Sequence, residues 1–355
     1  MAEFIPGMEL SRRYYHEIVR PLLDSSRFSH IPFAAAHLGP GSDVLGFDTD
    51  MSTDHDWGPS VHIFIREKDS KLSQDISQTL YAALPETFYG YHVNPQRLFI
   101  TTTRSFYWNR LSYDITTPLD PVDWLTFPSQ RLREVVSGVI HEDRSGELTL
   151  LRERFSYYPH DIWLYLMAAT WQRIGQEEHL VLRAGYVGDE LGSSIIGSRL
   201  VRDLMNLCFL LEREYAPYAK WFGTAFQQLQ CSPALGPIFK RVQLADTWKL
   251  REEALCESYL KIAHLHNSLS ITEKVSATVS NFYDRPFRVI YGARFSEAIL
   301  REIRDPEVKR IVSRPFIGGI DQFSDNTDMK ERHVSPIDST TSWRHILKRL
   351  YTESR

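Results

Sequence analysis

The sequence predicts an α+β protein in which a small mixed β-sheet domain is followed by an α-helical bundle domain. In the first third of the chain, apolar β-forming segments alternate with glycine turns and amphipathic helices. After a proline-rich stretch at 117–124, apolar residues recur at spacings of three and four, which is typical of helices. We therefore expect a sheet domain over residues 1–122 and a helical domain over residues 123–355.

Each element of the sheet domain has its own signal. An amphipathic pattern predicts a helix over 10–23, which Pro21 bends or ends. Another, with leucines and Ile76 on one face, predicts a helix over 71–84. Runs of β-branched, aromatic and other apolar residues predict four strands, at 31–38, 60–65, 88–93 and 98–104.

The helical domain is predicted from apolar spacing. The clearest case is 188–215, where Ile196, Leu200, Leu204, Leu207 and Leu211 form one stripe that faces a core. Residues 142–146 are expected to form a turn. Further helices are expected at 128–139, 148–154, 161–174, 253–269 and 342–351.

Bulk properties exclude several classes of protein. The net charge of -4 and the pI near 6.4 give no general attraction to nucleic acid or to a membrane surface. The three cysteines are widely spaced, so neither a disulfide framework nor a zinc site is indicated. No signal peptide is recognised, and the longest apolar run, 207–211, is too short to cross a bilayer. We expect a cytoplasmic protein.

The stretch from Gly39 to Trp57 carries the chemistry. Glycine at 41 allows close approach of the backbone to a ligand. Ser42 stands at the expected start of a helical turn, where its hydroxyl and free N–H groups suit a phosphate. We therefore expect Gly41 and Ser42 to bind a nucleotide.

Asp54 and Asp56 follow this pair after eleven residues and are expected to open the strand at 60–65. Residues two apart share a face of a strand, and two carboxylates about 4 Å apart repel by about 4 kcal/mol at an effective dielectric of about 20. A divalent cation between them removes that penalty. We expect Asp54 and Asp56 to bind a metal, His55 to be packed or capping, and Asp43, Asp48 and Asp50 to be solvated turn residues.

A glycine-serine turn followed by a spaced Asp-x-Asp resembles the nucleotidyltransferase superfamily related to DNA polymerase β. Two segments resemble one nucleotidyltransferase-like family more closely, domain of unknown function 4037 (DUF4037). They are Gly-Ser-Asp-Val-Leu-Gly-Phe-Asp and Asp-His-Asp-Trp-Gly-Pro. Three later stretches add to the likeness: Tyr158–Trp163, Gly188–Gly192 and Tyr215–Trp221.

The resemblance implies further site residues. The superfamily often has a third metal-binding acid on a later strand, but the strand at 98–104 has none. Asp114 and then Asp123 are the remaining candidates, and their alternative roles are turn and helix-cap residues.

Antibiotic (kanamycin-type) nucleotidyltransferases have a similar layout, and there an acid of the helical domain acts as general base. The resemblance assigns this role to Glu190, with Asp189 and Glu178 behind it; the alternative is stabilisation of helix ends. Lys220 is a candidate to bind a nucleotide phosphate, with helix-end packing as the alternative.

These features together predict a metal-dependent nucleotidyltransferase. It would transfer a nucleoside monophosphate, AMP by preference, from ATP or another NTP to a small hydroxylated acceptor, with Mg²⁺ or Mn²⁺ as cofactor. Its partners would be the nucleotide and the small molecule, without nucleic acid or membrane. The alternative is a nucleotide-binding or sensing protein that keeps the fold without turnover.

Overall fold

Two units make up the chain in the computed structural model, which describes residues 4–314, 316–327, 329 and 343–352. Unit 1 contains the described residues up to Leu119, residues 129–156, and the last helix up to Ile346. Unit 2 contains residues 120–128, the described residues of 157–329, and the last helix from Leu347. The terminal residues 1–3 and 353–355 of the two predicted domains lie outside the described residues.

Unit 1 is built on a mixed four-stranded sheet in the order β5-β2-β1-β6. The central strand β1 is antiparallel to β2 and β6, whereas β2 is parallel to β5. Helix α4 (Ser73–Tyr81) lies between β2 and β5 in the chain and provides the crossover that a parallel pair needs. The strands are β1 (Phe33–His37), β2 (Val61–Ile65), β5 (Leu98–Thr102) and β6 (Val139–Asp143).

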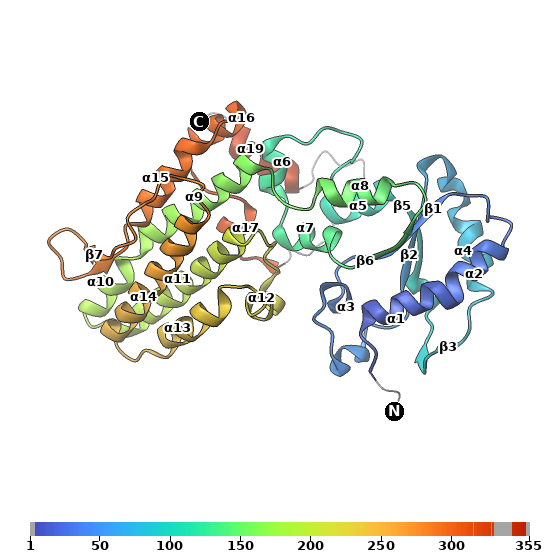
Figure 1. The fold of residues 1–355 in the computed structure, drawn as a ribbon, viewed down its shortest axis with the longest axis horizontal. Helices are drawn as coiled ribbons and strands as arrows, with labels where there is room; N and C mark the ends of the chain where they lie inside the picture. Colours follow the sequence, from blue (N-terminus) through green and yellow to red (C-terminus); the bar gives the residue numbers. More distant parts are fainter. Residues whose placement is uncertain (1–3, 315, 328, 330–342, 353–355) are drawn as a thin grey trace. The chain divides into compact units, whose positions relative to one another are not determined.

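Helices cover both faces of this sheet (Figure 1). On one face, Ala35, Ile63 and Leu98 pack in a core with Leu10 of α1 and Leu80 of α4. The other face carries α5, whose Phe106 contacts His62 and Phe64 of β2, and also α7 and α8. The helices of unit 1 are α1 (Gly7–Tyr14), α2 (Arg20–Ser25), α3 (Ser42–Leu45), α4 (Ser73–Tyr81), α5 (Thr103–Leu111), α7 (Ser129–Val136) and α8 (Glu147–Arg154).

Shorter elements complete unit 1. A π-helical turn, Tyr15–Val19, joins α1 to α2, so that Pro21 falls in the first turn of α2, where its missing N–H is harmless. The expected strand at 88–93 is a short hairpin of β3 (Thr87–Phe88) and β4 (Tyr91–His92). Three 3₁₀ segments are Asp50–Asp54, Glu67–Leu72 and Pro95–Arg97.

Strand β6 changes the extent of the sheet domain. The sequence predicts a turn at 142–146 and a helical domain from residue 123, but Val139–Asp143 pairs with β1 as an edge strand. This pairing places residues 129–156 in unit 1. The α+β class and the small mixed sheet are confirmed.

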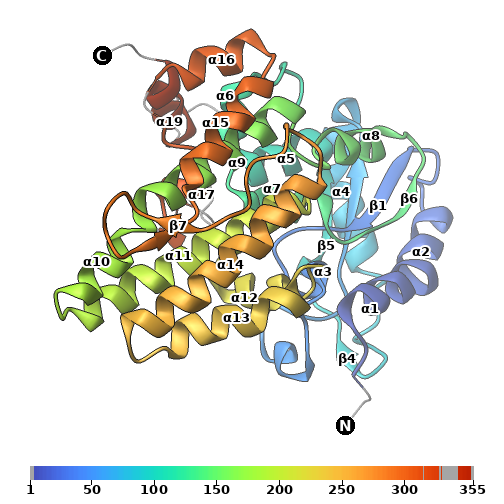
Figure 2. The ribbon, with the colours of Figure 1, turned by 60° about the vertical axis from the view of Figure 1, so that its left-hand side comes forward.

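Unit 2 is a helical bundle around α9 (His160–Glu177). Helix α15 (Gly292–Glu302) lies along α9 (Figure 2). Trp171 of α9 stacks on Phe295 of α15 with ring centroids 4.3 Å apart. Trp163 and Trp171 are fully buried, so these aromatic side chains form core rather than the wall of a cleft. The other helices are α6 (Pro121–Thr126), α10 (Leu180–Tyr186), α11 (Glu190–Leu211), α12 (Ala219–Phe226), α13 (Ser232–Leu244), α14 (Trp248–Ser268), α16 (Pro306–Val312) and α17 (Ile320–Phe323). Helix α19 (Trp343–Thr352) belongs to unit 1 up to Ile346 and to unit 2 from Leu347.

A hairpin of β7 (Ser280–Asn281) and β8 (Arg288–Val289) completes unit 2. Among the described residues, no helix has both the length and the apolar character needed to span a membrane.

Gly138 tests the packing of β6 against β1. It has a φ of +77°, and a Cβ there would lie 2.0 Å from the carbonyl oxygen of His37, which the strand holds in place. We predict that Gly138→Ala lowers the free energy of unfolding by about 3 kcal/mol, since strain adds to a clash with backbone. Urea denaturation measures the change.

Gly146→Ala is the matched control. Gly146 has a similar φ of +72°, but no heavy atom lies within 4 Å of its added Cβ. Only the backbone strain of about 1 kcal/mol is expected there. Equal losses in the two variants would contradict the close approach of Gly138 to β1.

Candidate functional site

The glycine-serine turn directly follows β1. The chain leaves the strand at His37, and the N–H of Gly39 donates to the carbonyl oxygen of Glu134 at 3.2 Å. Gly41 is the N-cap of α3, which begins at Ser42. A Cβ at position 41 would lie 1.9 Å from the Oδ1 of Asp43, so the turn needs glycine because a side chain already fills the space.

That side chain, Asp43, is buried beneath the turn. Its Oδ2 lies 2.8 Å from the Nε2 of His37 and 3.6 Å from a guanidinium nitrogen of Arg97. Burial alone would raise the pKa of Asp43, but the hydrogen bond with His37 and the charge of Arg97 bring it below its ordinary value. Asp43 is therefore an ionised anchor, and its interpretation as a solvated turn residue is wrong.

Arg97 joins the two parts of the motif. One guanidinium nitrogen faces Asp43, and the other donates to the carbonyl oxygen of Asp56 at 2.7 Å. Arg97 is largely buried, and desolvation lowers its pKa. One buried cation thus connects the turn at Gly41 and Ser42 to the loop of Asp54 and Asp56.

Asp54 and Asp56 do not lie on a strand. Asp54 ends the 3₁₀ segment Asp50–Asp54, and Asp56 has a φ of +51° in the following loop. Gly58, at a φ of +129°, and the N–H-lacking Pro59 delay β2 until Val61. The expectation that the two carboxylates share a strand face is wrong, and both side chains are exposed.

The loop itself is anchored by a neighbour of the motif. Asp48 accepts a hydrogen bond from the N–H of Gly7 at 2.7 Å and from the indole of Trp57 at 3.1 Å. Its interpretation as a solvated turn residue is therefore wrong, whereas Asp50 is exposed as expected. Asp54 accepts from His55 at 2.6 Å, so His55 lies beside the carboxylate rather than packed on an opposite face.

The donor set suits a cation that arrives with phosphate. Within the described residues, no three His, Cys, Asp or Glu side chains are grouped as a metal cage. Mg²⁺ is commonly held by one or two carboxylates together with substrate phosphates and water. Asp54 and Asp56 supply those carboxylates on an accessible loop, and they fit such an ion.

Arginines make the surroundings of the turn cationic. A Cβ on Gly39 would lie 3.5 Å from the guanidinium of Arg110, which is itself largely buried. Glu134 lies 2.9 Å from Arg131 and 3.7 Å from Arg110, so one carboxylate faces two guanidinium groups. In the described part of the chain, the buried Nε atoms of Arg97 and Arg110 have no hydrogen-bond acceptor. An anion near the turn would meet this excess of donors.

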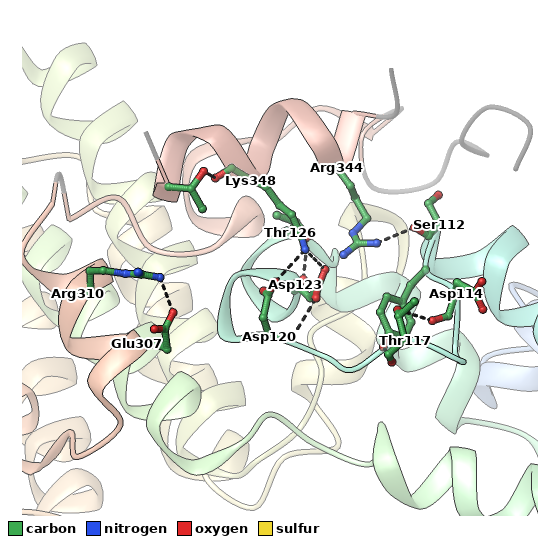
Figure 3. A network of polar contacts seen from close by, with 12 residues as sticks. Ser112, Asp114, Thr117, Asp120, Asp123, Thr126, Glu307, Arg310, Arg344 and Lys348 are labelled. Atoms are coloured by element: carbon green, nitrogen blue, oxygen red, sulfur yellow. Dashed lines mark hydrogen bonds and ion pairs between the residues drawn. The ribbon is translucent and has the colours of Figure 1, made fainter. Parts of the chain in front are cut away.

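The two candidates for a third acid are engaged elsewhere. Asp114 forms a bidentate pair with Arg104 at 2.6 and 3.0 Å, and this hydrogen bonding lowers the pKa of Asp114 to about 2. Asp123 is the N3 residue of the α6 capping box, where it accepts from the N–H of Asp120 at 3.1 Å, and it lies 2.5 Å from Lys348 of α19 (Figure 3). Both side chains thus have the turn or cap roles that were weighed as alternatives.

The acids expected as general base also hold local structure in unit 2. Asp189 is the N-cap of α11 and accepts from the N–H of Gly192 at 2.7 Å. Glu190 accepts from the N–H of Trp248 at 3.0 Å and from the guanidinium of Arg251 at 3.2 Å, both on α14. These contacts give both residues a structural role.

Glu178 is buried in unit 2. It accepts from the backbone N–H groups of Ile290 at 2.7 Å and Gly292 at 3.1 Å, which fixes the start of α15. Burial raises the pKa of Glu178 to about 7, although these hydrogen bonds oppose the rise.

Lys220 lies exposed on α12. Its ammonium group is 4.9 Å from the centroid of the Trp221 ring, a cation–π contact at the start of the helix. Among the described residues of unit 2, the contact found for the Lys220 ammonium group is this one with Trp221.

The residues that connect the motif were missed from the sequence. They are His37, Arg97 and Arg110, together with Asp43 in its buried role. His37 lies only six residues before Asp43, but Arg97 meets Asp43 through the pairing of β1, β2 and β5, so no local pattern reveals that contact. The one available signal is the position of Arg97 directly before a strand.

Comparison with known proteins supports the family that the sequence resembles. The model of the family described as "Domain of unknown function (DUF4037)" matches residues 124–222. This part of the chain is therefore similar to that family. The match contains the three later stretches that carried the likeness, whereas the turn and the Asp-x-Asp loop precede it.

A comparison with solved structures found one match. It is a nucleotidyltransferase-like protein from Exiguobacterium sibiricum 255-15, with 14% identity, a TM-score of 0.31 and coverage of 74% of each chain. No curated protein matches the chain.

Arg97 can be tested as the link within the site. We predict that Arg97→Met lowers the free energy of unfolding by about 3 kcal/mol, because it leaves the buried Asp43 without its cation. Arg66→Met is the control, since Arg66 pairs with Asp69 at 3.0 Å but is partly exposed, and such pairs contribute about 1 kcal/mol or less. Equal losses in urea denaturation would contradict the linking role.

The raised pKa of Glu178 should make the stability of the fold depend on pH. Because its folded-state pKa is raised from the ordinary 4.5 to about 7, the stability linked to its proton is present below pH 4.5 and is lost as pH rises through 7. We predict that melting temperature falls more steeply from pH 5 to 8 in the wild type than in Glu178→Gln.

Glu297→Gln is the control for Glu178→Gln, since Glu297 lies on α15 and its side chain is 66% exposed. It should keep the wild-type slope. The same pH profile for the wild type and Glu178→Gln would show that the raised pKa is wrong.

Proposed function

We propose that this chain is a metal-dependent nucleotidyltransferase that transfers a nucleoside monophosphate, AMP by preference, to a small hydroxylated acceptor. Gly41 and Ser42 would bind the nucleotide phosphates. Asp54 and Asp56 would bind the Mg²⁺ or Mn²⁺ that accompanies ATP.

The contact of Arg97 with both halves of the motif is the observation that carries this proposal. The Gly-Ser turn and the Asp-x-Asp loop are separated in the sequence, and one side chain holds both, through Asp43 and through the carbonyl oxygen of Asp56. A solvated loop of Gly, Ser and Asp residues would not need a buried ion pair at its base. The arrangement supports a single site with phosphate-binding and carboxylate groups.

Each group of the site has a distinct contribution. The N–H groups and hydroxyl at Gly41 and Ser42 would orient the phosphates, and Arg110 would add positive charge near Gly39. A bound divalent ion would stabilise charge that develops on the phosphate during displacement. The protein would thus act by positioning and electrostatics.

The role of general base is not assigned to Glu190 in this proposal. Its carboxylate would have to leave Trp248 and Arg251 to accept a proton from an acceptor hydroxyl. The same holds for Asp189 and its helix cap. The structural contacts of both acids therefore argue against either of them as general base.

A second candidate function is nucleotide sensing without transfer. It is favoured by the exposed loop positions of Asp54 and Asp56 and by the structural pairs of Asp114 and Asp123. Incubation with α-labelled ATP and a metabolite extract separates the two. Transfer of label to a small molecule supports the enzyme, whereas metal-dependent binding without transfer supports the sensor.

Nucleotide binding is tested first by calorimetry with Mg²⁺ and α,β-methylene-ATP. We predict that the double variant Asp54→Asn, Asp56→Asn weakens binding about tenfold or more, a loss of about 1.4 kcal/mol, because the neutral amides do not hold the ion.

Asp50→Asn is the matched control in the same 3₁₀ segment. Asp50 is also an exposed acid, so it tests whether any loss reflects only the local negative charge. Its affinity should stay within about twofold of the wild type. Equal binding by the wild type and the double variant would end the proposal.

A further inference from the structure

Unit 2 contains an open pocket of about 510 Å³ that the nucleotide site does not use. Its floor is one face of α9, formed by Ala169, Gln172, Arg173, Gln176 and Glu177. The spacing of three, one, three and one puts these residues on a single stripe of the helix. Trp171 and Ile174 of the same helix are fully buried in the bundle. The end of α9 therefore has a core face and a pocket face.

The wall opposite α9 is fixed in place. The side-chain amide of Gln322 donates to the carbonyl oxygen of Leu166 at 2.7 Å and to the hydroxyl of Thr170 at 2.6 Å. Its oxygen accepts from the N–H of Gly319 at 2.7 Å, and Arg173 donates to its main-chain carbonyl. Phe316, Ile317 and Phe323 add an apolar surface to this wall. The pocket is thus built by specific contacts between α9 and residues 316–325.

Charges in and beside the pocket are matched in pairs. Arg173 lies 2.9 Å from Asp203, and Arg199 lies 2.7 Å from Glu177. Arg202 pairs with Asp325 in the same way. Burial raises the pKa of Asp203 to about 6, although the charge of Arg173 opposes this rise. A pocket with this balance favours neither a strong anion nor a strong cation.

Two amides are available to a ligand. Gln172 and Gln176 are one helical turn apart, and neither side chain has a hydrogen-bond partner within the described residues. Each amide offers one acceptor oxygen and two donor hydrogens. Side chains with adjacent donors and acceptors suit vicinal hydroxyl groups, and the apolar side chains of Phe316 and Phe323 suit the C–H groups of a ring. Small-molecule sites commonly combine such apolar walls with a few oriented polar groups.

We infer that this pocket binds a neutral, polyhydroxylated small molecule of the sugar or cyclitol class. As a binding site the pocket stands on its own lining. The ligand would take hydrogen bonds from Gln172 and Gln176 and pack its ring on the aromatic wall.

Saturation-transfer NMR on the full chain without nucleotide tests this inference. The probes are D-glucose, D-galactose, D-ribose and myo-inositol, with inorganic phosphate as a charged competitor. We expect at least one polyol to bind and phosphate not to displace it. Because nucleotide is absent, this result does not depend on the outcome of the ATP titration.

Variants locate the binding. Gln172→Leu with Gln176→Leu should weaken binding about tenfold, as expected for loss of two hydrogen bonds of about 0.5–1.5 kcal/mol each. Gln228→Leu is the control, an exposed glutamine just after α12 that does not line the pocket, and it should bind as the wild type does.

Phe323→Ser is a second variant. Its side chain is 40% exposed, so the change is compatible with folding, and it should also weaken binding. Failure of every polyol to bind the wild type, unchanged binding in the double variant, or displacement by phosphate would each overturn the inference.

Discussion

The buried carboxylate of Asp43 is the constraint on which the candidate site depends. An ionised acid below a turn is costly unless it is paired and hydrogen-bonded, and His37 and Arg97 satisfy both needs. This requirement fixes the neighbouring backbone. Position 41 must be glycine because the Asp43 side chain occupies the space of a Cβ. The same holds for Gly7 of α1, where an added Cβ would lie 2.3 Å from the Cβ of Asp43.

Arg97 extends this constraint to the Asp-x-Asp loop. It stands at the start of β5, two strands away from β1, and the sheet order brings it beneath the turn. Its second guanidinium nitrogen holds the carbonyl oxygen of Asp56 and leaves the carboxylate side chain free to face solvent. The arrangement fixes the backbone of the loop while its acidic side chains stay accessible, which suits recruitment of a hydrated ion.

Helices were easier to predict from the sequence than the details of the site. The expected segments at 188–215 and 253–269 correspond to α11 and α14. They could be predicted because a helix that buries one side has a long stripe of apolar residues there. Strand β6 was missed because Val139–Asp143 is a half-buried edge strand with His141, Glu142 and Asp143 among its five residues. Hydrogen bonding to β1 makes this segment a strand although its own residues do not show a strand pattern.

The site shows the same limit. The positions of Gly41, Ser42, Asp54 and Asp56 were visible as a motif, but Asp54 and Asp56 were wrongly assigned to a strand although Gly58 and Pro59 were there to interrupt it. The buried role of Asp43 could not be predicted locally, because its partner Arg97 reaches it only in the folded sheet. Short polar residues have the same appearance in a solvated loop and in an anchored one, and only tertiary contacts distinguish them.

Amide hydrogen exchange read by mass spectrometry tests the central claim most directly. The claim is that the Gly-Ser turn and the Asp-x-Asp loop form one site. Addition of Mg²⁺ with α,β-methylene-ATP should slow exchange in residues 39–46 and in residues 52–57 together, at the same nucleotide concentration. Slower exchange in only one of these segments, or in neither, would contradict a single nucleotide site built around Asp43 and Arg97.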